Sequence, residues 1–300
     1  MTVPEPVLTV TGLSIDYLVD PVVHAVRDVS FVLRRGEVLG LAGESGCGKS
    51  TLAYGIARLL KPPATITAGA AVFHPRDGED VDWQQLDAGR LRAARWDQIS
   101  MVFQGAMNSL NPVISIRAQM EDVFTAHRPA MGRRERRRRC AELLERVGVD
   151  PARLTAYPHE LSGGMRQRVM IATAMALEPQ LMIMDEPTTA LDVVVQREIL
   201  REITRLRDEL GFAVLFITHD LPLLLEISDR IAVMRDGEVV ELGDAVALYT
   251  EPKHDYTKRL LASFPSLTGE RGAFLRQGLD ERLLALDATS TPDPAREVTT

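Results

Sequence analysis

Nine consecutive residues, Gly43 to Thr51, have the spacing Gly-x-x-x-x-Gly-Lys-Ser that suits a phosphate group. Glycines let the backbone curl until successive N–H groups point at one anion. A helix that starts in the loop adds the positive end of its dipole. Lys49 can then reach the β- and γ-phosphates, and the Ser50 hydroxyl can coordinate Mg²⁺. The residues predicted to hold the phosphates are Gly43, Ser45, Gly46, Cys47, Gly48, Lys49, Ser50 and Thr51.

The flanking residues supply the elements that such a loop needs. Val38–Ala42 is a short apolar run typical of a buried strand. Lys49 to Leu60 has the pattern of a helix that ends before Pro62-Pro63. A glycine-rich connection without a ligand is the alternative, but a strand before the loop and a helix after it favour the phosphate site.

Composition narrows the class of protein. The 300 residues suffice for one large α/β domain with an appendage, and the 45% hydrophobic content allows a sizeable core. The net charge of −7 argues against nucleic acid as the main partner. The two cysteines, Cys47 and Cys140, do not predict a disulfide, and they cannot by themselves hold zinc or an iron–sulfur cluster.

No apolar run reaches the roughly 18 residues of a membrane span. The N-terminus, with Pro4, Glu5 and Pro6, lacks the basic and apolar regions of a signal peptide. We therefore expect a cytoplasmic protein, with docking on a membrane protein left open.

The N-terminal third is predicted to be rich in strands. Residues 7–35 alternate apolar and polar side chains around a turn at Asp20-Pro21, which predicts an antiparallel layer. Tyr17, the only Tyr, Trp or Phe before Phe31, could stack on adenine or simply pack on the sheet. His24, on the following strand, is the alternative stacking residue.

The middle of the chain is predicted to hold a hairpin, a strand and then helices. The hairpin pairs residues 70–73 with 81–83, and residues 99–103 form a short strand directly followed by Gln104. Residues 108–112 form a loop, and 113–160 are mostly helical. Six of the seven residues 133–139 are arginines, which could meet anionic lipid or nucleic acid. The interleaved glutamates favour a solvated helix face instead.

A second glycine-containing helix start follows at Leu161 to Gln167, and its helix is expected to run through Leu177. Ser162 is a candidate N-cap, and Gly163 and Gly164 would leave N–H groups exposed beside a positive dipole end. This predicts a second anion-binding surface without a lysine, although Ser-Gly-Gly alone is weak evidence.

Two further strands end in polar residues. Asp185 and Glu186 follow the apolar run 181–184, and ligands bind at the carboxyl ends of parallel strands. Asp185 suits the second shell of a Mg²⁺ ion and Glu186 suits the polarisation of an attacking water, although both could be solvated loop carboxylates. After a helix over 193–210, strand 213–217 ends in Thr218-His219-Asp220, which puts His219 at the same edge.

The last part of the chain changes in character. Residues 231–234 and 239–242 flank an Asp-Gly pair and predict a hairpin. Residues 265–300 are rich in Ser, Thr, Gly, Pro and charge, with one helical patch at 279–286 and a loose tail from Thr289.

With these motifs in order, residues 7–264 resemble the ATP-binding subunit of an ABC transporter. In the terms of that family the motifs are Walker A at Gly43 to Thr51, the Q-loop Gln104, the signature Leu161 to Gln167, Walker B at Leu181 to Glu186, the D-loop Asp192 and the switch His219.

The resemblance implies an α/β fold: a P-loop NTPase (RecA-like) core with an antiparallel β subdomain and an inserted α-helical subdomain. The ATP-binding domain would span residues 1–264, with the helical subdomain at about 105–177, and residues 265–300 would be a C-terminal extension.

The resemblance also assigns roles with ATP and Mg²⁺ as cofactors. Ser50 and Gln104 would ligate or sense Mg²⁺, and Asp185 would support the metal. Glu186 would orient or deprotonate the water, and His219 would contact the γ-phosphate. In this family one ATP lies between Walker A of one subunit and the signature of another, so Ser162, Gly163 and Gly164 would act on the partner's nucleotide. Asp192 is expected at the nucleotide as well.

Finer features resemble the oligopeptide, dipeptide and nickel importers: Ser109 to Pro112, and Pro252 to Leu261, where Asp255 replaces a proline. Some members hold an iron–sulfur centre on a C-terminal cysteine cluster. This chain has no cysteine after Cys140, so we expect none. Relatives that carry oligosaccharides or metal chelates are the alternative.

The expected partners are a second ABC ATPase subunit, favoured to be a different chain, two transmembrane permease subunits and an extracytoplasmic solute-binding protein, with no nucleic acid. The expected place is the cytoplasmic face of the cell membrane. A chromosome-maintenance ATPase would need a long coiled coil between Walker A and the signature. A small-molecule kinase would not need the signature, and a scaffold would tolerate loss of Lys49, Glu186 or His219.

Overall fold

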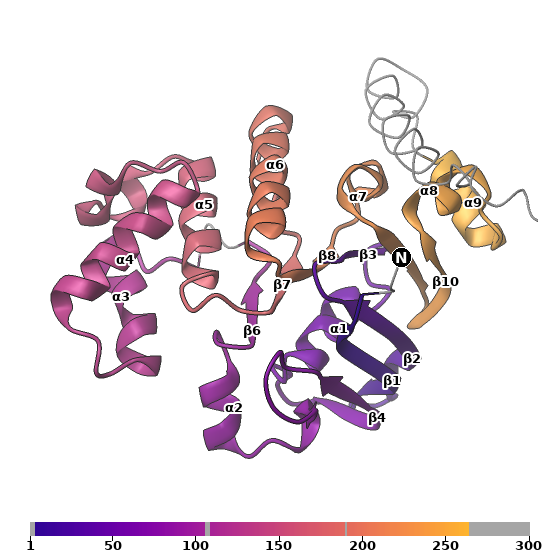
Figure 1. The fold of residues 1–300 in the computed structure, drawn as a ribbon. Coiled ribbons are helices and arrows are strands. Elements are labelled where there is room, and N and C mark those ends of the chain that lie inside the picture. Colours follow the sequence, from indigo (N-terminus) through magenta and orange to yellow (C-terminus); the bar gives the residue numbers. More distant parts are fainter. Residues whose placement is uncertain (1–3, 106–108, 190, 264–300) are drawn as a thin grey trace, which may run out of the picture.

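The computed structural model describes residues 4–105, 109–189 and 191–263, which form two β-sheets and the helices around them (Figure 1). The strands are Pro6–Tyr17 (β1), Val23–Arg34 (β2), Val38–Ala42 (β3), Ala64–Phe73 (β4), Val81–Asp82 (β5), Ile99–Val102 (β6), Leu181–Asp185 (β7), Ala213–Ile217 (β8), Arg230–Arg235 (β9) and Glu238–Asp244 (β10). The α-helices are Lys49–Ile56 (α1), Ala88–Ala94 (α2), Ile116–His127 (α3), Arg133–Arg146 (α4), Gly163–Ala174 (α5), Val193–Leu210 (α6), Leu221–Ile227 (α7), Ala245–Thr250 (α8) and Asp255–Ala262 (α9).

The larger sheet has the strand order β10-β9-β3-β8-β7-β6. Its strands pair in parallel from β9 to β6, and only β10 is antiparallel. The carboxyl ends of β3, β8, β7 and β6 therefore lie next to one another, where the sequence places its polar motifs. This confirms the predicted α/β core.

The smaller sheet is antiparallel, in the order β2-β1-β4-β5. It confirms the antiparallel layer predicted for residues 7–35. The expected hairpin is present too, since β4 pairs with β5 through Val72 opposite Asp82. Trp83 is the exception to that prediction: it starts a 3₁₀ turn, Trp83–Gln85, because the Asp82 side chain accepts a hydrogen bond from the Gln84 N–H.

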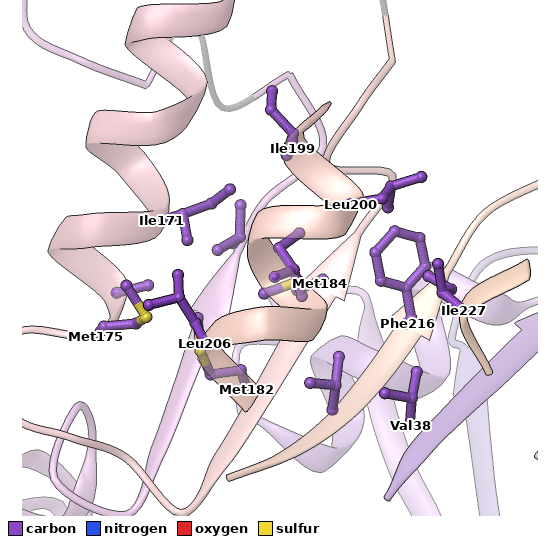
Figure 2. Packing of buried hydrophobic residues seen from close by; sticks show 14 of the residues in the cluster. Val38, Ile171, Met175, Met182, Met184, Ile199, Leu200, Leu206, Phe216 and Ile227 are labelled. Carbon is purple, nitrogen blue, oxygen red and sulfur yellow. The ribbon is translucent and has the colours of Figure 1, made fainter. Parts of the chain in front are cut away.

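Alternate side chains of the parallel strands enter two different cores. Met182 and Met184 of β7 face a core that includes Ile171 and Met175 of the α5 segment and Leu206 of α6 (Figure 2). Leu181 and Ile183 face the other core, which the antiparallel sheet and α1 complete. Strands buried on both faces explain why their sequences are continuous apolar runs.

The helices α3, α4 and α5 gather beyond the β6 edge, while α8 and α9 lie beside β10 at the opposite edge (Figure 1). The arginine-rich run forms the start of α4. Arg138 pairs with Glu135 and Glu142, and Arg139 pairs with Glu142 and Glu178. This pairing favours the solvated helix face over a binding surface.

Two helices end earlier than expected. The phosphate-loop helix stops at Ile56 instead of Leu60, because Arg58 adopts a left-handed backbone with φ of 53° and its guanidinium donates to the Leu86 carbonyl. The helix from Gly163 stops at Ala174 instead of Leu177, and the chain turns at Glu178, where φ is 56°. The contact at the end of α1 comes from a distant part of the chain, so a local pattern does not reveal it.

Within the described ranges, no helix combines the length and apolar character needed to cross a membrane. The helical patch and tail expected over 265–300, and Asn108 of the expected loop, lie outside the described residues.

Candidate functional site

The phosphate loop connects β3 to α1 and relies on its glycines for close packing. Gly46 and Gly48 have φ of 82° and 105°, values that favour glycine. A Cβ on Gly48 would lie 2.2 Å from the Ala25 carbonyl oxygen, and one on Gly43 would lie 2.2 Å from the Met234 carbonyl oxygen. The glycines thus let the loop lie against two neighbouring strands while it curls.

Lys49 is buried beneath the loop. Its Nζ donates hydrogen bonds to the Gly43 and Glu44 carbonyl oxygens, each at 2.8 Å. Because α1 begins at Lys49, the first backbone N–H groups of this helix have no partner within the helix. The loop therefore combines an anchored ammonium with the positive end of a helix, as an anion site requires.

A cleft of about 520 Å³ opens over the loop. Ten of the residues named in the sequence analysis line this cleft: Tyr17, His24, Ser45, Gly46, Gly48, Lys49, Ser50, Thr51, Gln104 and Glu186. The Tyr17 hydroxyl lies 3.2 Å from Thr51 Oγ1, and His24 Nδ1 lies 2.9 Å from Asp16 Oδ1. The structure thus brings both candidate stacking residues to the cleft, and the choice between them stays open.

Asp185 is fully buried beside the loop. Its Oδ1 accepts a hydrogen bond from Ser50 Oγ at 2.9 Å. Burial raises the pKa of Asp185, and the Ser50 hydrogen bond only partly offsets this effect. The Tyr54 hydroxyl also lowers the pKa of this carboxyl. Oδ2 has no hydrogen-bond partner among the described residues.

These residues fit a magnesium ion. A buried carboxylate oxygen without a partner, next to a serine hydroxyl and within reach of the phosphate loop, matches the oxygen ligands and second-shell supports that Mg²⁺ takes.

Glu186 is held from three sides. Its Oε1 lies 3.0 Å from His219 Nδ1, and its Oε2 accepts from Thr189 Oγ1 at 2.9 Å and Gln104 Nε2 at 3.2 Å. Burial alone would raise the pKa of Glu186, but the hydrogen bonds from His219 and Thr189 and the charges of His219 and Lys49 hold its pKa below its ordinary value. The carboxylate is therefore ionised at neutral pH and fixed in direction.

The signature residues and Asp192 do not line this cleft. Ser162 caps α5, with its Oγ accepting from the Met165 N–H at 3.3 Å, which confirms the predicted cap. A Cβ on Gly164 would lie 2.7 Å from Val195 Cγ1 of α6. Asp192 caps α6 through the Val194 and Val195 N–H groups. The second helix start that was predicted to bind an anion thus lies outside the cleft over the phosphate loop.

Several residues at the site were not predicted from the sequence. Thr189 orients Glu186, Tyr54 acts on Asp185, and Arg27 and Gly237 line the cleft. Thr189 could have been found, because it lies three residues after Glu186. Nothing local pointed to Arg27 or Gly237, since pairing between distant strands brings them to the loop.

Comparison with known sequences gives the family. The profile described as "ABC transporter" matches residues 26–189. A protein of Brucella abortus described as a putative peptide import ATP-binding protein is 45% identical over 265 residues, which cover 87% of this chain and 78% of the relative. A peptidoglycan transport ATP-binding protein of Agrobacterium fabrum is 46% identical, and this chain spans 47% of its length.

Solved structures agree with this result. A dimeric ATP-binding cassette in a post-hydrolysis state with ADP and Pi aligns with a TM-score of 0.69 and 30% identity, covering 79% of this chain and 98% of the other. A component of an ABC transporter complex from Clostridium perfringens aligns with a TM-score of 0.69 and 28% identity, covering 88% and 97%.

The position of Tyr17 predicts a base-dependent loss of affinity when its ring is removed. We expect Tyr17→Ala to raise the Kd for ATP about 5- to 150-fold, since stacking on an aromatic ring is worth about 1–3 kcal/mol per base. Binding of inorganic tripolyphosphate should not change, because it has no base. Titration calorimetry with both ligands would measure this.

Tyr17→Phe is the matched control, because it keeps the ring and removes only the hydroxyl contact with Thr51. Equal weakening of ATP and tripolyphosphate by Tyr17→Ala would mean that the ring merely packs on the sheet. A base-dependent loss in His24→Ala alone would assign the stacking to His24.

Proposed function

Because this chain belongs to the ABC transporter family and is an ATP-binding ATPase, we propose that it energises the import of peptides or similar small solutes across a membrane. We infer peptides as the cargo from the 45% identity to relatives described as putative peptide import ATP-binding proteins. The importer-like segments Ser109 to Pro112 and Pro252 to Leu261 support it. The alternative is the same ATPase role with oligosaccharides or metal chelates as cargo. Because one relative is described as a peptidoglycan transport ATP-binding protein, solutes other than peptides should also be tested as cargo.

Within this proposal the ATP-binding domain spans residues 1–264, with the helical subdomain at about 105–177. The amides of residues 46–51 and Lys49 bind the triphosphate. Ser50 and Gln104 hold Mg²⁺ with support from Asp185, and the metal supplies charge neutralisation at the phosphates. Glu186 orients the attacking water and accepts its proton. His219, which contacts Glu186, steadies the γ-phosphate.

The signature acts on a second subunit's nucleotide. What supports this is the separation of Ser162 and Gly164 from the chain's own cleft, together with the similarity to cassettes solved as dimers. Gly163 and Asp192 take part in the same interface. We favour a different ATPase chain as the partner, because the importer group that the importer-like segments resemble commonly pairs two different ATPases.

The helical region 105–160, which follows Gln104, docks the permease, and this contact extends to a cleft beside β6. The cleft has a volume of about 190 Å³ and is lined mainly by apolar side chains, which include Leu59, Met101 and Phe103. Two buried polar atoms at this cleft, Trp83 Nε1 and Ser100 Oγ, have no hydrogen-bond partner among the described residues. Phe103 precedes Gln104, which contacts Glu186, so an occupant of the cleft lies one residue from the catalytic side chains.

In the assembled transporter this chain is a peripheral subunit at the cytoplasmic face of the membrane. It works with a second ATPase, two permease subunits and an extracytoplasmic solute-binding protein. Nucleic acid and an iron–sulfur cluster have no part in the proposal.

Glu186→Gln should separate binding from hydrolysis. The amide keeps the size of the side chain but cannot accept a proton, so turnover in the assembled transporter should fall by about 10²–10⁴-fold, the scale of a lost general base. ATP binding should persist in a filter-binding assay. Glu251→Gln, the same change at an exposed position, should leave turnover unchanged. Near-normal hydrolysis by Glu186→Gln would remove Glu186 from this role.

Ser162→Arg should harm the partner's site more than the chain's own. The isolated chain should bind ATP within about twofold of the parent, while ATPase activity of the complex should fall at least about tenfold, because bulk and charge enter the shared interface. Ser115→Arg removes an equivalent cap on α3, and ATP binding by that isolated chain measures the effect of cap loss alone. An equal loss of ATP binding by the isolated Ser162→Arg chain would contradict action across the interface.

Leu59→Arg should prevent assembly with the permease. A guanidinium at the apolar cleft would have to be buried without a partner, so co-purification with the permease subunits should be lost. ATP binding by the isolated chain should be retained. Val240→Arg, on β10 at the opposite sheet edge, should co-purify normally. Normal assembly of Leu59→Arg would exclude this cleft as the docking site.

A further inference from the structure

The C-terminal helix α9 reaches the phosphate loop through one side chain. The Glu44 N–H donates a hydrogen bond to the Tyr256 hydroxyl oxygen at 3.2 Å, across 212 positions of sequence. Tyr256 is only 5% exposed. The second residue of the phosphate loop is thus bound by an element from the far end of the described chain.

Tyr256 is itself firmly placed. The Glu241 carboxylate accepts hydrogen bonds from the Lys253 and His254 N–H groups at 2.8 and 3.0 Å, which fixes the chain just before α9. His254 Nδ1 then accepts from the Tyr256 N–H at 3.1 Å and caps the helix. The Arg235 guanidinium lies 5.2 Å from the centre of the Tyr256 ring, a cation–π distance.

The bond to Glu44 acts on the same peptide group that holds the catalytic-site lysine. The Gly43 carbonyl and the Glu44 N–H belong to one planar peptide unit. Lys49 Nζ donates to the Gly43 carbonyl oxygen at 2.8 Å, while Tyr256 accepts from the Glu44 N–H on the other side. Rotation of this peptide would break both contacts, so the tyrosine hydroxyl fixes the direction of the carbonyl that anchors Lys49.

We propose that Tyr256 is a positioning residue for the phosphate loop: its hydroxyl holds the Gly43–Glu44 peptide and thereby the Lys49 ammonium in the place where the triphosphate binds. This inference rests on the proposed role of Lys49 in nucleotide binding. No residue of α9 lines the nucleotide cleft. Under this inference, α9 nevertheless influences nucleotide affinity through the Tyr256 hydroxyl.

The test is Tyr256→Phe in the full chain and in the assembled transporter. The ring and its contact with Arg235 remain, and only the hydroxyl is lost. A hydrogen bond between neutral groups contributes enough to change an equilibrium about 2- to 10-fold, so the Kd and KM for MgATP should rise by that factor. The kcat should stay within about twofold, because Glu186 and His219 are untouched. The melting temperature should change by less than about 3 °C.

Tyr249→Phe is the matched control. It makes the same change on α8, where the tyrosine hydroxyl has no hydrogen bond to any described residue. An unchanged KM in Tyr256→Phe, or an equal rise in Tyr249→Phe, would overturn the inference. A fall in kcat without a change in KM would overturn it as well.

Two further variants keep the outcome decisive. If Tyr256→Phe also lowers the melting temperature, Leu260→Ala, which weakens the packing of α9 and leaves the hydroxyl in place, should raise KM less at the same loss of stability. An equal rise would attribute the effect to helix docking and overturn the inference. Lys49→Ala tests the premise separately: intact ATP binding in that variant would refute the proposed phosphate site, whatever Tyr256→Phe does.

Discussion

The parallel pairing of four neighbouring strands is the constraint on which the rest of the structure depends. β3, β8, β7 and β6 lie side by side, so the residues that follow them meet at one edge. Lys49, His219, Glu186 and Gln104 come from four separate parts of the chain and reach one another only because of this strand order. A change in the order of β7 and β8 would leave each motif intact and remove the site.

Much of this arrangement could be predicted because its signals are local. Buried strands on both faces of a layered fold must be apolar throughout, so β3 and β8 were predicted with their observed ends, as was α6 from its amphipathic pattern. The end of α1 could not be predicted, because a contact between Arg58 and the distant Leu86 carbonyl sets it. The contact between Tyr256 and the phosphate loop also depends on tertiary packing, and no spacing in the sequence encodes it.

The two helix starts that are predicted to bind anions differ in their surroundings. Both have glycines and exposed N–H groups, but only the loop before α1 carries a lysine and lies beside Asp185 and Glu186. The start of α5 offers a dipole and donors with no nearby catalytic side chain among the described residues. Under the proposed function, one triphosphate would contact both kinds of surface, one from each of two subunits, and hydrolysis would then be coupled to their association.

The geometry at Glu186 fixes the direction of its side chain. Its backbone has a φ of 46°, an uncommon value for a residue with a side chain, and the bond from its N–H to the Ile217 carbonyl at 2.8 Å maintains it. The same bond ties the end of β7 to β8, from which His219 follows. Because its hydrogen bonds hold the pKa of Glu186 below its ordinary value, the carboxylate is ionised at neutral pH, as the proposed roles of orienting the water and accepting its proton require. The uncommon backbone angle and the three hydrogen bonds together fix the direction of the Glu186 carboxylate.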